Sequence, residues 1–165
     1  MSKFEIHDQH AEKIYQADII NVHEAQRVDH FGLGLKSLAA HDYASARRQL
    51  SAAAEADPGN HIVSYYLSLA QLDGRRPHMH SGATVEQIQR RLNTAVDRLP
   101  AAKALLILVA EDYQLAWRAS EYIPAELIDL IRSVPVQQAL EIVEHVPAEE
   151  SRVWRLLSAR IKGGD

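Results

Sequence analysis

Histidine is the residue of this chain that could do the widest range of chemistry, and the sequence has nine of them. His78 and His80 lie two residues apart in a loop, where two imidazoles could chelate a borderline metal ion. Catalytic zinc needs three protein ligands and structural zinc four, but the loop adds only Asp73. His7 and His10 fall in a segment predicted to be a strand, where their spacing places them on opposite faces. We therefore expect no metal site and no cofactor.

Arginines form a second candidate cluster, because three Arg-Arg pairs stand at 47–48, 75–76 and 90–91. Four of them could converge in a basic patch that docks an acidic partner: Arg75, Arg76, Arg90 and Arg91. The alternative is that the arginines lie on solvated helix faces, paired with Glu55, Glu86 and Asp97. The formal net charge of −4 gives no overall basic field, which disfavours nucleic acid as a partner.

The remaining residue patterns predict no catalysis. There is no cysteine, and nothing resembles a serine nucleophile elbow. Glu111 and Asp112 are adjacent carboxylates, but neighbouring helical residues point about 100° apart and do not face one site. The stretch "FGLGLKS" is no phosphate loop, because Leu35 separates Gly34 from Lys36. We expect the protein not to be an enzyme.

Length and composition limit the fold and the location. A chain of 165 residues suits one domain with a continuous core. The longest apolar run, residues 104–110, is far shorter than the about 20 residues that span a bilayer. The first ten residues lack the apolar core of a secretory signal. We expect a cytoplasmic protein that does not associate with membranes.

Residues 1–24 differ from the rest because apolar and β-branched residues there follow a strand-like spacing. Apolar side chains occupy both faces of this β-prone segment, so both faces should be covered. The helical body could cover one face, and a second copy of the same segment is the simplest source of backbone partners, making a homo-oligomer. The alternatives are a monomeric hairpin that lies on the helices and a tail that orders only on binding. The residues predicted to mediate this self-association are Tyr15, Ile19, Ile20 and Val22.

From residue 25 to residue 162 the apolar spacing is helical, and the last residues, 163–165, are predicted to fray. "AAHDY" and the Asp-Pro-Gly-Asn stretch at 57–60 predict tight connections. Thr84 looks like the N-cap of a helix over 85–99 that Pro100 ends, and a long apolar helix is predicted over 101–123. Pro124, Pro135 and Pro147 should each begin a shorter helix. These elements predict an all-α fold with at least six helices.

The stretch from Leu33 to Pro58 resembles a tetratricopeptide repeat. Six residues stand at the spacing of that family: Leu33, Gly34, Ala46, Leu50, Ala53 and Pro58. His30 and Ser37 depart from it, since the family usually has Trp and Tyr there. Looser matches to a second and a third repeat extend the resemblance over roughly residues 25–117, and the alternative is another all-α repeat. The resemblance implies a short solenoid of helical hairpins.

The resemblance also implies the function of an adaptor or scaffold, which binds a protein or peptide on a concave face. The positions expected to line that face are Arg27, His30, Gly34, Ser64, Ser68 and Gln71. Lys36 is the only lysine of the first helix, so the family's carboxylate-binding clamp is not matched. The alternative function is a structural or signalling assembly component that self-associates through the N-terminal segment. "EKIYQADIINV" faintly resembles short β-prone segments that precede repeat domains in bacterial signalling proteins.

Overall fold

A computed structural model describes residues 28–114 and 122–163, and in these ranges the protein is helical with no strand. The predicted all-α fold is thereby confirmed for the described residues, whereas the predicted β segment, 1–24, lies outside them. The described elements are α2 (His30–Ala39), α3 (Tyr43–Ala56), α4 (His61–Gln71), a short 3₁₀ helix η1 (Pro77–Met79), α5 (Gly82–Asn93), α6 (Pro100–Tyr113), α7 (Ala125–Ser133), α8 (Val136–His145) and α9 (Arg152–Gly163).

Short polar signals set the first two connections, as the sequence predicts. The side chain of Asp42 accepts a hydrogen bond from the amide of Ser45 and caps the start of α3. The next turn needs Gly59, whose φ of +95° is unfavourable for other residues. Asn60 then accepts hydrogen bonds from two amides of the first turn of α4. The chain therefore reverses direction sharply twice within about thirty residues.

Small residues allow α2 and α3 to approach closely. Ala46 and Leu50 are completely buried and Ala53 is nearly so, and these three residues form the inward face of α3. A methyl group added at Gly34 on α2 would lie only 2.6 Å from Cγ of Leu50. Glycine at that position thus sets the distance between the two helices.

The predicted start and end of α5 and the predicted end of α6 are wrong. Ser81, not Thr84, is the N-cap of α5, because its hydroxyl accepts from the amide of Thr84. The helix ends at Asn93, where the hydroxyl of Thr94 donates to the carbonyl of Arg91. Pro100 consequently begins α6 rather than ending α5, and α6 ends at Tyr113 instead of continuing to residue 123.

Prolines mark the starts of two of the last three helices. Pro124 and Pro135 directly precede α7 and α8, as predicted. Helix α9, however, begins at Arg152 and not after Pro147. The hydroxyl of Ser151 accepts from the amide of Trp154, and the carbonyl of Ser151 accepts from the amide of Arg155. Ser151 is therefore the N-cap of α9. At the other end, α9 includes residue 163, which was predicted to fray.

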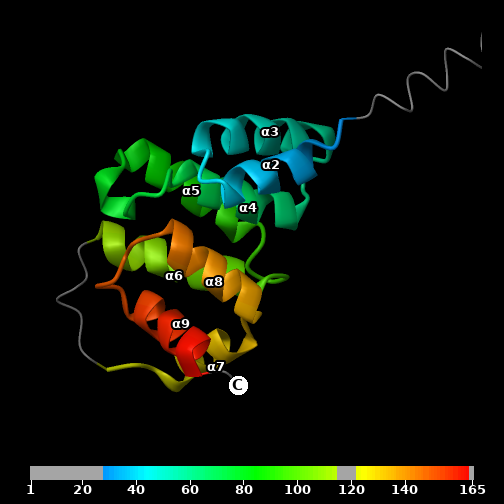
Figure 1. Ribbon diagram of the computed structural model, residues 1–165. Coiled ribbons are helices and arrows are strands. Elements are labelled where there is room, and N and C mark those ends of the chain that lie inside the picture. The colour runs from blue at the N-terminus through cyan, green and yellow to red at the C-terminus, as the bar shows by residue number, and fades with distance from the viewer. Residues whose placement is uncertain (1–27, 115–121, 164–165) are drawn as a thin grey trace, which may run out of the picture.

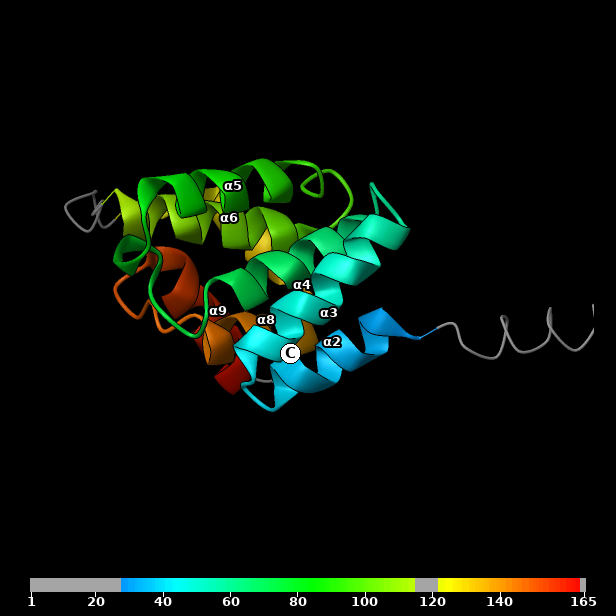
Figure 2. The same cartoon turned by 90° about the horizontal axis from the view of Figure 1, so that it is seen from above.

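Consecutive helices from α2 to α6 pack each against the next, and α9 packs against α6, α7 and α8. Figure 1 shows α2 to α5 on one side of the molecule, α7 and α9 on the other, and α6 and α8 between them. Figure 2 shows the same body from above, with α4 lying between the α5–α6 pair and the α2–α3 pair. One continuous core joins all these helices. The assignment to tetratricopeptide repeats stays a prediction. Within the two described ranges, none of the helices combines the length and apolar character needed to cross a membrane.

Candidate functional site

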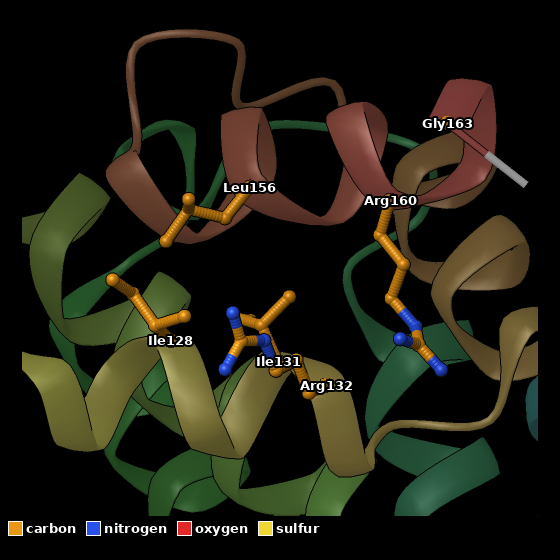
Figure 3. A pocket seen from close by; sticks show the side chains of 6 residues that line it. All are labelled: Ile128, Ile131, Arg132, Leu156, Arg160 and Gly163. Carbon is orange, nitrogen blue, oxygen red and sulfur yellow. The ribbon is translucent and has the colours of Figure 1, made fainter. Parts of the chain in front are cut away.

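A groove of about 250 Å³ lies between α7 and α9, and Figure 3 shows it from close by. Six residues line it: Ile128, Ile131 and Arg132 from α7, and Leu156, Arg160 and Gly163 from α9. Ile128 and Leu156 stand on opposite walls at one end and Arg160 stands at the other, whereas the side chain of Arg132 reaches back so that its guanidinium lies between Ile128 and Arg160 (Figure 3). The groove is therefore mostly apolar, with two separate guanidinium groups along its length.

The sequence of the two helices explains how these residues reach the groove. Leu127 and Ile131 of α7 and Leu157 of α9 point into the core and fix the rotation of each helix. The residues next to them, Ile128 and Leu156, are left only half-buried. Each is followed four positions later by an arginine on the same helix face. The sequence patterns did not predict this site, although each of the two helices carries an aliphatic residue with an arginine four positions later.

Arg160 is a groove residue that has an unpaired hydrogen-bond donor within the described residues. Its Nε atom is buried and has no hydrogen-bond partner among them. Leaving a buried donor unpaired costs about 1–3 kcal/mol, and more for a charged group. Among the described residues, the ion pair of Arg132 is an exposed one with Asp129 of its own helix, at 3.6 Å. Exposed ion pairs contribute little to stability, so the guanidinium groups of Arg132 and Arg160 can each bind an anionic ligand.

A polar network joins the C-terminal end of α8 to the start of α3. The hydroxyl of Tyr43 lies 2.9 Å from Nδ1 of His145 and 3.0 Å from Nδ1 of His41. Nε2 of His41 lies 3.0 Å from a carboxylate oxygen of Glu144. His145 is only 2% exposed. Burial lowers the pKa of His145; Glu144 opposes this effect and His41 adds to it. The network thus fastens the last helices to the first ones.

Aromatic residues of α2 and α4 form a face that α8 covers. The rings of Phe31 and Tyr66 pack edge to face with centroids 5.9 Å apart, and Tyr65 stands 4.9 Å from Tyr66. Burial raises the pKa of Tyr66 above its usual range, and the nearby Glu141 carboxylate of α8 raises it further. Burial likewise raises the pKa of Glu141. This face is therefore occupied by the protein's own helix.

Two carboxylates at the end of α6 hold two separate loops. Asp112 accepts hydrogen bonds from the guanidinium of Arg76 and from both the amide and Nδ1 of His78. Glu111 accepts from the hydroxyl of Ser151 and from the guanidinium of Arg152. Burial raises the pKa of Asp112, but its hydrogen bonds to Arg76 and His78 outweigh burial and hold the pKa below its usual value. Both carboxylates act as structural anchors in these contacts.

The predicted concave-face residues mostly contact α3 and α5. Nδ1 of His30 lies 2.8 Å from the side-chain oxygen of Gln49, and Gln71 bonds to side chains of α5. Gly34 and Ser68 are buried, and the predicted partner-binding face stays a prediction. The hydroxyl of Ser68 donates to the carbonyl of Ser64 at 2.8 Å, so it is satisfied without solvent. Arg27 lies outside the described residues, as do Tyr15, Ile19, Ile20 and Val22.

The four arginines of the candidate basic patch each have a partner of their own. Arg90 pairs with Glu86 at 3.3 Å, a partner that the alternative interpretation named. Arg76 pairs with Asp112 and Glu150, which that interpretation did not name. Arg91 donates to the side-chain oxygen of Gln71, and Arg75 lies 3.9 Å from Asp73. Burial lowers the pKa of Arg91. Much of the positive charge of these residues is therefore balanced locally.

The loop histidines and the last tryptophan also have structural contacts. His78 contacts Asp112, whereas Nε2 of His80 lies 2.9 Å from the carbonyl oxygen of Leu72. Among the described residues there is no group of three or more metal-binding side chains. Trp154 is half-buried and packs against the core.

Comparisons with protein-family models, curated proteins and solved structures found no match for this chain.

Proposed function

We propose that this protein is a non-catalytic interaction module that binds a segment of a partner protein in the groove between α7 and α9. The observation that carries the proposal is the composition of that groove, which combines aliphatic walls with two arginines. Interfaces are enriched in arginine around a buried apolar centre. The resemblance to tetratricopeptide repeats supports the same class of function.

The size of the groove supports a protein ligand over a small molecule. Pockets that enclose whole ligands have volumes of about 300–1,000 Å³. The groove, at about 250 Å³, lies below that range. It is large enough for one or two side chains of a larger molecule that remains outside. A protein segment that inserts a few side chains fits this volume best.

The aromatic face of α2 and α4 is a less suitable binding surface in this conformation. Helix α8 covers it, with Glu141 beside Tyr66 and Glu144 beside His41. A partner would have to displace α8, whose Ala139 and Ile142 belong to the core. That displacement would expose these apolar side chains to water, which is unfavourable. The groove between α7 and α9 requires no such rearrangement.

A selection from a random peptide library on the immobilised full chain tests the proposal. We expect enriched peptides whose binding is lost in an Ile128→Glu variant, because the new carboxylate would place a charge in the aliphatic end of the groove. Ile62→Glu is the matched control. Ile62 is an isoleucine of α4 with 39% exposure, so this variant should bind the peptides as the parent does.

Circular dichroism should first show that both variants keep the parent's helical content. If Ile128→Glu unfolds the protein, Arg132→Glu replaces it, because Arg132 is largely exposed and its charge reversal leaves the core intact. The proposal fails if no peptide is enriched over an empty support. It also fails if the enriched peptides bind the folded groove variant as tightly as they bind the parent.

A further inference from the structure

Four polar side chains form an unbroken chain of contacts between the turn that follows α2 and the end of α8. In order along the chain of contacts, they are Glu144, His41, Tyr43 and His145, and each neighbouring pair lies 2.9 or 3.0 Å apart. The side chains of Glu144 and His41 are 47% and 50% exposed, whereas His145 is 2% exposed. The contacts therefore connect solvent to a buried imidazole.

The hydroxyl of Tyr43 limits how hydrogen atoms can be arranged in these contacts. It carries one hydrogen, but it lies within hydrogen-bond distance of Nδ1 of both His41 and His145. It can donate to only one of them, so the other Nδ1 must carry a hydrogen and donate to the hydroxyl oxygen. On the far side of His41, Nε2 must donate to Glu144, because a carboxylate only accepts hydrogen bonds.

Two arrangements of hydrogen atoms satisfy all of these contacts while His145 stays neutral. In the first, Tyr43 donates to a neutral His41, and Nδ1 of His145 donates to Tyr43. In the second, Nδ1 of His41 donates to Tyr43, and Tyr43 donates to Nδ1 of His145, whose hydrogen is then on Nε2. His41 is doubly protonated and positively charged in the second arrangement. The two arrangements therefore differ by one proton.

The backbone of His41 adopts a conformation that is unfavourable for a residue with a side chain. Its φ of +58° lies in the left-handed region, and glycine is the usual residue there after a helix. The imidazole of His41 contacts both Tyr43 and Glu144 from this position. Such backbone conformations are found preferentially at functional sites, where the side chain has a task.

We propose that these four residues form a proton relay, in which a proton taken up by buried His145 is delivered through Tyr43 to His41. The incoming proton binds Nε2 of His145, and Nδ1 of the same ring releases its proton to the oxygen of Tyr43. The hydroxyl passes its original proton to Nδ1 of His41. The network thereby gains one proton in total, and the charge resides on the exposed ring, where it costs less than in the core.

The charged groups around the relay favour this direction of transfer. Glu144 of α8 contacts His41 directly and stabilises its positive charge. Asp73, in the loop after α4, also acts on Tyr43, but it is paired with Arg47 of α3 at 2.7 Å. Delivery of the proton to the Glu144 end therefore matches the charges in the fold.

The relay determines how the contact between α3 and α8 responds to acid. The first proton leaves every contact in place, because only the donors and acceptors are exchanged. A second proton finds no further acceptor in the relay, so it charges His145 itself and loosens the end of α8 from α3. This pH-sensitive connection is independent of the function proposed above for the groove.

Nitrogen NMR of the histidine side chains in the full chain tests the relay, because the chemical shift of each ring nitrogen shows whether it carries a hydrogen. As the pH is lowered, we expect His145 to move its hydrogen from Nδ1 to Nε2 in the same step in which His41 becomes doubly protonated. In Tyr43→Phe this change of tautomer should be lost. Tyr113→Phe is the matched control and should behave as the parent, since Tyr113 is 37% exposed at the end of α6.

If Tyr43→Phe unfolds the protein, His41→Asn replaces it, because asparagine tolerates the left-handed conformation but cannot take up the proton. In that variant His145 should keep one tautomer until it becomes charged itself. The relay is wrong if His145 of the parent keeps its tautomer while His41 becomes doubly protonated, or if both rings become charged in one step. A change of tautomer that persists in folded Tyr43→Phe also overturns it.

Discussion

At the scale of single residues, Gly34 shows how a missing side chain sets the packing of two helices. A Cβ atom at this position would meet Cγ and Cδ2 of Leu50 at 2.6 and 2.7 Å. Leu50 is completely buried and has little room to move. Overpacking of this kind costs about 1–3 kcal/mol, whereas alanine gains about 1 kcal/mol over glycine in helix propensity.

We therefore expect Gly34→Ala to lower the free energy of unfolding by up to about 2 kcal/mol, because overpacking outweighs the gain in propensity. Urea denaturation measures the change. In a Leu50→Ala background the same substitution should become neutral or stabilising, since the clash is gone. If Gly34→Ala has the same effect in both backgrounds, the contact with Leu50 does not determine the packing of α2 on α3.

At the scale of elements, the buried carboxylate of Asp112 fastens the loop between α4 and α5 to α6. Its side chain is 1% exposed, and it accepts hydrogen bonds from Arg76 and His78. Arg76 is 24% exposed and keeps its ion pair with Glu150, so its charge is not left uncompensated, but the amide and ring of His78 lose their acceptor. Asp112→Ala should therefore lower the free energy of unfolding by about 1–3 kcal/mol.

An exposed ion pair provides the control for this prediction. Glu86 and Arg90 on α5 are 67% and 73% exposed, so Glu86→Ala should change stability by no more than about 0.5 kcal/mol. Thermal and urea denaturation of the two variants allow a direct comparison. Similar losses in both would show that burial of Asp112 does not determine its contribution. Hydrogen exchange in residues 73–81 should increase in Asp112→Ala, because this loop loses its anchor.

The elements also show what sequence patterns can and cannot predict. Helix α3 was predicted correctly because its buried face and its Asp57-Pro58 stop are local signals. The start of α9 was not predicted, since Ser151 is held in place by Glu111, forty residues away in the chain. Arg76 pairs with Asp112 of α6, and Arg91 donates to the side chain of Gln71 in α4. Such tertiary contacts leave no periodic signal, so local patterns do not reveal which positive charges stay unpaired.

At the scale of the whole molecule, residues 1–24 are predicted to join copies of the chain through Tyr15, Ile19, Ile20 and Val22. These residues lie outside the described part of the structure, and the prediction stands on the apolar character of both strand faces. Deletion of residues 1–25 should leave the helical content of the body unchanged but lower the oligomeric mass. Light scattering at tens of micromolar, a range chosen for moderate association constants, measures that mass. A strictly monomeric parent protein contradicts the prediction.

The contact between α8 and the first helices makes the stability of the whole molecule dependent on pH. Burial lowers the pKa of His145 below the value of about 6.5 in the unfolded chain. The unfolded state therefore binds more protons than the folded state as pH falls below about 6.5. The contribution of neutral His145 is complete above that pH and is lost as pH falls toward its folded pKa. Glu144 and His41 face the same network.

We expect the urea midpoint of the parent protein to fall between about pH 7.5 and pH 5.5, and His145→Asn to reduce that dependence. Asparagine keeps a side chain that can bond to Tyr43 but has no group that titrates in this range. His61→Asn is the control, because His61 begins α4 and is outside the network, so it should keep the slope of the parent. The dependence of the urea midpoint on pH that remains in His145→Asn then comes from the other titratable groups. If the slopes of His145→Asn and the parent coincide, protonation of His145 does not loosen the connection between the two ends of the fold.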